Sequence, residues 1–168
     1  MTRKIATEAL TAEAFGPFGD VLDSAGIPDT VINQGRCGRF HDRARLDFGS
    51  APGRAGISVF LAEPRALPLA LEMVERHPEA SQAFLPMQEH PFLVVVAPDE
   101  DGRPGMPRAF LTDGAQGINL LRGTWHGVLT PLAAPGRFAV VDRIGPGPNL
   151  QEHWFDTPWT VLDGRIAA

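Results

Sequence analysis

Glycine and proline interrupt this sequence from end to end. The chain has 168 residues, of which 18 are glycine and 16 are proline, and they follow no period. Inside a helix each proline costs about 3 kcal/mol and each glycine about 1 kcal/mol, so long helices are disfavoured. Short strands joined by turns tolerate the same residues well. The sequence therefore predicts a β protein.

The segments between these breaks have the composition of strands. Residues 67–75 carry large apolar side chains at 67, 69, 71 and 73, which indicates a strand; if it runs on, Glu75 and His77 lie on the face of Leu71. Residues 92–97 are apolar on both faces, so we expect this strand to be central. Further strands are predicted at residues 19–22, 31–33, 56–62, 83–87, 108–112, 117–121, 125–129, 137–143 and 152–155.

One short helix is expected near the N-terminus. Thr11 can cap residues 12–15, and Gly16-Pro17 then ends the helix. About ten strands at this spacing are typical of an antiparallel β-barrel or jelly roll. The length fits one domain covering residues 1–168, without repeats or a linker that would divide it. The interior of such a barrel can hold a small ligand.

Charge and cysteine content exclude several classes of protein. The formal net charge is −5, so the whole molecule has no positive field for nucleic acid or an anionic membrane. The longest apolar run, residues 91–98, is much shorter than the roughly 20 residues of a membrane helix. The single Cys37 excludes an internal disulfide framework and a multi-cysteine zinc site. We expect a soluble, cytoplasmic protein.

Two of the five histidines, His77 and His126, lie in sequence patterns that suggest a function. His77 follows Glu75 by two residues and precedes Gln82 by five, and His126 ends the run Gly123-Thr124-Trp125-His126. This spacing resembles the two motifs of the cupins, and it places the four ligand positions of that fold at Glu75, His77, Gln82 and His126. Glu75, His77 and His126 would hold a divalent metal on one side and leave positions for substrate. Gln82 is a neutral amide that is better suited to hydrogen-bonding a substrate.

A purely structural interpretation of these residues stays open. His77 can bond locally beside Pro78, and Glu75 can pair with Arg76 or Arg143 on the surface. Surface ion pairs of this kind contribute less than about 1 kcal/mol. The chain therefore has either a metal site with few ligands or an ordinary set of satisfied polar groups.

The resemblance extends beyond the cupin motifs to one family. From about residue 15 to residue 155, several short sequence motifs are similar to those of the ureidoglycolate lyase family. These motifs are INxGxxxRFHD at residues 32–42, ERHPxxxQAFxPM at 75–87, Gly117-x-Asn119, Trp125-His126 and Asp142-Arg143. The resemblance implies a cupin-like homodimer in allantoin and purine catabolism. It also implies a carbon–nitrogen lyase of the amidine-lyase type, which cleaves (S)-ureidoglycolate to glyoxylate and urea, with nickel as the divalent metal or with no metal.

This reaction assigns roles to the candidate residues. His126 is either the general base for the substrate hydroxyl or a ligand, together with Glu75 and His77, of a metal that lowers the pKa of that hydroxyl. We expect the substrate to be bound by Arg39, His41, Gln82, Asn119 and Arg143. The arginines suit the carboxylate, and the two amides suit the ureido group.

Three alternatives remain at this stage. The chain could be a metal-dependent cupin with another reaction, or a non-catalytic cupin that binds another small carboxylate. It could also release ammonia from ureidoglycolate, as a hydrolase would. The sequence does not separate these activities, since they use the same kinds of residue.

Overall fold

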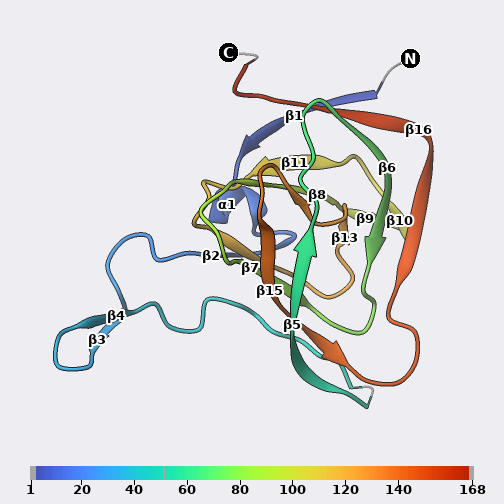
Figure 1. Cartoon of the computed structure of the whole chain (residues 1–168). Helices are drawn as coiled ribbons and strands as arrows, with labels where there is room; N and C mark the ends of the chain where they lie inside the picture. Colours follow the sequence, from blue (N-terminus) through green and yellow to red (C-terminus); the bar gives the residue numbers. More distant parts are fainter. Residues whose placement is uncertain (1–2, 51, 167–168) are drawn as a thin grey trace.

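The computed structural model describes residues 3–50 and 52–166. Six strands close into a ring in the order β11–β1–β16–β6–β13–β8, because β8 also pairs with β11 (Figure 1). The ring strands and the short strand attached to β8 are β1 (Arg3–Ala9), β6 (Leu69–Arg76), β8 (Phe92–Ala97), β11 (Arg108–Leu111), β13 (Trp125–His126), β16 (Gln151–Leu162) and β14 (Thr130–Pro131). The all-β barrel expected from the sequence is confirmed, although β1 runs parallel to both of its neighbours.

A second sheet packs against one side of this ring. Its strand order is β2–β12–β7–β15–β5, and all of its pairings are antiparallel. The strands are β2 (Gly19–Leu22), β5 (Arg54–Ala62), β7 (Gln82–Pro86), β12 (Gly117–Leu120) and β15 (Gly136–Ile144).

Strand β8 is the wall between two apolar cores. Val94 and Val96 pack in the core between the ring and the second sheet. Val95 and Ala97 face the other way, into the core inside the ring. The expectation that residues 92–97 form a central strand is thus confirmed, since all six are buried.

The predicted N-terminal helix is also present. Helix α1 (Ala12–Phe15) is a single turn whose Thr11 Oγ1 accepts a hydrogen bond from the Ala14 N–H at 3.2 Å. Phe15 is fully buried in the core between the sheets. The helix thereby closes one side of that core.

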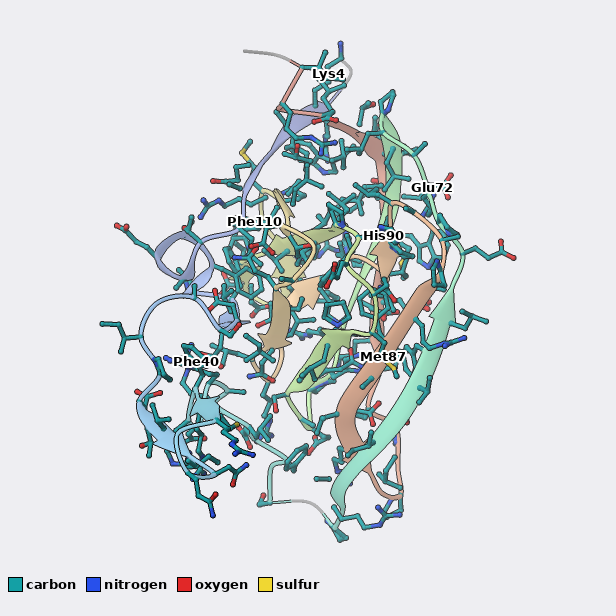
Figure 2. The ribbon with its side chains drawn as sticks, turned by 60° about the vertical axis from the view of Figure 1, so that its left-hand side comes forward. Lys4, Phe40, Glu72, Met87, His90 and Phe110 are labelled. Carbon is teal, nitrogen blue, oxygen red and sulfur yellow. The ribbon has the colours of Figure 1, made fainter. Side chains whose placement is uncertain are left out.

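A hairpin projects from the body as an arm. Its strands β3 (Thr30–Ile32) and β4 (Cys37–Arg39) pair only with each other among the described strands (Figure 1). Figure 2 shows Phe40 on this arm, away from Phe110 in the barrel. Where the arm rejoins the body, Asp20 accepts bonds from the Arg45 backbone N–H and Arg45 Nε at 2.8 and 2.7 Å. A further small hairpin joins β9 (Asp99–Glu100) and β10 (Arg103–Pro104).

Strand β6 corrects one sequence expectation. Leu71 and Val74 both pack in the core inside the ring, so the alternation of β6 breaks between them. On the neighbouring strand β16 the register shifts between Trp154 and Trp159. Because of this irregularity Glu75 faces away from the core that holds Leu71, and the expectation that the two share a face was wrong.

The ends of several strands also differ from the sequence prediction. The strand expected at residues 125–129 is only Trp125–His126, and β16 runs to Leu162 instead of ending near Phe155. Within the described residues no helix has the length and apolar character that a membrane crossing requires.

Candidate active site

Glu75 and His126 are direct partners across the antiparallel pair β6–β13. On its other side His126 pairs with Val96, which faces the core between the sheets. Directly paired residues point to the same face of a sheet, so Glu75 and His126 also face that space. His77 lies just beyond the end of β6, and one ligand atom from each of these three polar residues lies within 4.8 Å of the others.

Backbone carbonyls fix the tautomer of both imidazoles. His77 Nδ1 lies 2.7 Å from the Asn149 carbonyl oxygen, and His126 Nδ1 lies 3.0 Å from that of Gly127. A carbonyl oxygen only accepts, so Nδ1 is a donor in each ring and Nε2 is the ring atom left for a ligand. Both Nε2 atoms are buried and meet no hydrogen-bond partner in the part of the chain that the structure describes.

Burial disfavours the charged forms of His126 and Glu75. Burial lowers the pKa of His126 to about 4; the bond to Gly127 opposes this shift and the nearby His77 adds to it. Burial raises the pKa of the Glu75 carboxyl, a shift that His77 opposes and Glu152 reinforces. The site therefore presents a neutral His126 beside a carboxyl that resists ionisation.

A clamp formed by Arg76, Trp125 and Asp99 on the opposite face holds β6 and β13 together. The Arg76 guanidinium lies 4.4 Å from the centre of the Trp125 ring. Asp99 Oδ1 accepts hydrogen bonds from both residues, from Arg76 at 2.7 Å and from Trp125 at 2.8 Å. The hydrogen bond from Trp125 is the main reason that the pKa of Asp99 is lowered. Since Arg76 adjoins both Glu75 and His77 in the chain, this clamp sets the backbone that presents the cluster.

The second sheet contributes an amide and a carboxyl to the same interior. Ala83 pairs with Val141 across β7–β15, which makes Gln82 and Asp142 the next neighbours along these strands. The Gln82 side chain lies close enough to the Asp142 carboxyl to affect its pKa. Burial raises the pKa of Asp142, whereas Gln82 and the nearby His77 oppose that shift. Gln82 and Asp142 thus lie beside the cluster.

The other predicted site residues lie elsewhere. Asn119 is on the outer face of the second sheet, where its amide donates to Asp20 Oδ2 at 3.0 Å. Arg143 follows Asp142 and so faces the opposite side of β15, donating to the Pro52 carbonyl oxygen at 2.6 Å. Arg39 and His41 are exposed on the arm. The fold of one chain does not bring these four to Glu75, His77, Gln82 and His126, and their roles stay predictions.

Two residues of the site were missed by sequence reasoning. Asp142 had a usable signal, because Phe138 and Val140 are buried at the same alternation on β15. Asn149 had none, since it lies in an irregular segment rich in glycine and proline. It nevertheless orients His77 through its carbonyl, and its side-chain oxygen accepts from the Glu79 N–H at 2.7 Å.

The cluster fits a divalent metal. Two imidazoles whose Nε2 atoms meet no partner among the described residues and one carboxyl group form a donor set typical of transition-metal ions. Hydrogen bonds from Nδ1 to backbone carbonyls are the usual way in which metal-binding histidines are oriented. The rings of His77 and His126 have their centres 5.3 Å apart and their planes tilted by 37°, close enough for both to bind one ion.

Known proteins resemble this chain over nearly its whole length. The family model described as ureidoglycolate lyase matches residues 2–162. The ureidoglycolate lyase of Rhodobacter capsulatus is 61% identical over 158 residues, which cover 94% of this chain and 98% of that protein. That of a Chelativorans species is 50% identical, covering 95% and 96% of the two chains. The enzyme of the same name from Pseudomonas aeruginosa is 47% identical, covering 91% of each. Matches of this extent show that the chain belongs to the ureidoglycolate lyase family.

Proposed function

We propose that this chain cleaves (S)-ureidoglycolate to glyoxylate and urea, as a lyase built from one catalytic domain. The observation that carries the proposal is a set of buried polar atoms left unpartnered between the sheets of a family member. His77 Nε2, His126 Nε2, Gln82 Oε1 and Asp142 Oδ1 all lack a hydrogen-bond partner among residues 3–50 and 52–166. Buried polar groups are normally paired, so such a group of exceptions supports a ligand site.

The substrate sets clear demands. Its central carbon carries a hydroxyl, a carboxylate and a ureido nitrogen. Cleavage removes the hydroxyl proton, forms the carbonyl of glyoxylate, breaks the C–N bond and returns a proton to the departing nitrogen. A site for this reaction needs a proton acceptor near the hydroxyl, donors and acceptors for the urea part, and positive charge for the carboxylate.

A divalent ion bound at this site would complete its charge balance. Glu75 and the Nε2 atoms of His77 and His126 are the residues that would hold it. When bound, the ion supplies the positive charge for the carboxylate and lowers the pKa of the substrate hydroxyl. Nickel, the metal that the family resemblance implies, accepts such a nitrogen and oxygen donor set.

The structure favours the ligand role for His126 over the base role. With a pKa of about 4, its Nε2 is a weak acceptor of a proton at neutral pH. The same property keeps the lone pair free for a metal at nearly all physiological pH values.

We also propose that the chain forms a homodimer through the outer face of the second sheet. On the edge strand β5 the side chains of Ile57, Val59 and Leu61 are 78%, 65% and 73% exposed on one face. A row of apolar residues on an open sheet is typical of an interaction surface. The arm is the complementary feature, since a two-stranded hairpin is marginally stable alone and this one exposes Val31. In a dimer with two-fold symmetry, the arm of each copy would cover the exposed face of β5 on the other copy, so both apolar surfaces would be buried.

The activity is tested by incubating the metal-loaded protein with ureidoglycolate and measuring glyoxylate, urea and ammonia separately. Glyoxylate and urea in equal amounts, faster than spontaneous decay, are expected. A chelator should abolish the acceleration and added divalent metal should restore it. Ammonia in place of urea would identify a hydrolase, and binding without turnover would identify a non-catalytic protein; either result would overturn the proposal.

A further inference from the structure

Two unpaired acceptor oxygens lie side by side at the second-sheet end of the site. Gln82 Oε1 and Asp142 Oδ1 are buried, and neither meets a donor in the described residues. Their strands are direct neighbours, through the pairing of Ala83 with Val141. Leaving a buried acceptor unpaired is costly, so two of them together indicate that donors come from a ligand.

The orientation of the Gln82 amide is set by its neighbour. The Gln82 side chain lies close enough to the Asp142 carboxyl to oppose the rise in its pKa, and an ionised carboxylate can only accept. The NH₂ group of Gln82 is therefore the end that suits Asp142, and its Oε1 is left without a partner among the described residues. On the other side Gln82 pairs with the buried Leu120, which offers no polar side-chain group. The pair thus presents acceptors without a matching donor.

The ureido group supplies what this pair lacks. It carries N–H groups on both nitrogens, whereas the glyoxylate part of the substrate carries none. A carboxylate accepts two parallel N–H bonds well, and bonds to a charged acceptor are stronger than neutral ones. The opposite end of the site, at Glu75, His77 and His126, has the donor set for a metal and the oxygen-rich half of the substrate.

We propose that Gln82 and Asp142 form the urea-binding end of the site, accepting N–H bonds from the ureido group while the cluster of Glu75, His77 and His126 faces the hydroxyl and carboxylate. This inference rests on the proposed function. The C–N bond to be broken then lies between the two ends. A compound without ureido N–H groups leaves both acceptors unpaired, and a site built for hydrogen bonds rejects such compounds strongly.

The test compares two ligands that share only one end. Ureidoacetate has the ureido group and the carboxylate but no hydroxyl, so it cannot be cleaved and acts as a competitive inhibitor. Glyoxylate has no ureido group. In Asp142→Asn the carboxylate acceptor becomes an amide of the same shape, and the KM for ureidoglycolate and the Ki for ureidoacetate should both rise about tenfold to a hundredfold. The Ki for glyoxylate should change less than about twofold.

Two further variants keep the test decisive. Gln82→Met removes the amide with little change of volume and should raise the same two constants. Asp156→Asn changes an exposed aspartate on β16 and should leave every constant unchanged. The metal affinity and thermal unfolding of each variant, measured directly, show whether the fold and the cluster are intact.

The outcomes are distinguishable. If the wild-type protein neither cleaves ureidoglycolate nor binds ureidoacetate, the proposed function fails and the urea-binding role fails with it. If the wild type cleaves its substrate but Asp142→Asn leaves the Ki for ureidoacetate unchanged, only the urea-binding role is overturned. An equal rise in the Ki for glyoxylate would also overturn it, because a general distortion of the site would then explain the effect.

Discussion

Glu75 and His126 face each other as a cross-strand pair of β6 and β13, although 50 residues separate them in the chain. On the opposite face their strand neighbours, Arg76 and Trp125, stack on each other and share the acceptor Asp99. The pairing therefore fixes one carboxylate and one imidazole at neighbouring positions before any ligand arrives. Preorganisation of this kind is what a metal site and a catalytic site both require.

Removing either imidazole of the cluster should abolish most of the activity. His77→Ala and His126→Ala each delete an Nε2 that faces the interior, and we expect kcat/KM to fall by about 10²–10⁴. Metal affinity, measured by titration, should fall in the same two variants. The matched control is His90→Ala, whose imidazole lies outside the cluster. Equal activity of the His126→Ala and His90→Ala proteins would contradict the assignment.

The stability of the metal-free protein should depend on pH through His126. Its folded pKa is about 4, below the ordinary value of 6.5, so between these values the unfolded chain binds a proton that the folded chain does not. Stability is thus lost as the pH falls from about 6.5 to about 4, by about 3 kcal/mol at most. Urea denaturation at several pH values measures this loss. His126→Gln should have a flatter profile, and an unchanged slope would refute the prediction.

The base of the arm should also respond to acid. Burial alone would raise the pKa of Asp20, but hydrogen bonds from the Arg45 backbone, Asn119 and the Arg45 side chain outweigh it and lower the pKa. The stabilising contribution is therefore present above the unfolded pKa and is lost as the pH falls through the folded one. Asp20→Asn should cost about 1–3 kcal/mol at pH 7 and less at pH 3. A difference from wild type that is constant with pH would contradict this.

Much of the fold could be predicted from the glycine and proline residues that end each element and from the alternation of apolar and polar residues. The central strand at residues 92–97 and the Thr11-capped helix were predicted because their signals are local. Strand β1 was not, since its partners β16 and β11 lie more than 100 residues away along the chain. The face of Glu75 relative to Leu71 was predicted wrongly, because the irregularity in β6 depends on its pairing with β16.

The candidate site, too, was predicted from the sequence only in part. Glu75, His77, Gln82 and His126 were found from motif spacing, and the structure brings them together. Alternation alone could have separated two of the other candidates, since Asn119 stands between the buried core residues Ile118 and Leu120. Arg143 likewise alternates with the inward-facing Asp142. The carbonyl that orients His77 belongs to Asn149 in a loop, and no sequence pattern predicts this contact.

A charge on the outer face of β5 should prevent dimer formation. Val59 is exposed and centred between Ile57 and Leu61, so Val59→Asp would place a carboxylate in the middle of the proposed contact. Light scattering after gel filtration should give the mass of a dimer for the wild type and of a monomer for the variant. The exposed Glu72→Asp serves as the control. A monomeric wild type, or a dimeric Val59→Asp, would rule out this interface.

The most direct test of the account is the product balance of the wild-type protein and His77→Ala on (S)-ureidoglycolate, with the nickel-loaded and the chelated form of each. We predict equal amounts of glyoxylate and urea from the loaded wild type, and rates close to spontaneous decay from its chelated form and from both forms of the variant. Full activity of loaded His77→Ala, or nitrogen released as ammonia by the wild type, would contradict the claim that this cluster carries out the lyase reaction.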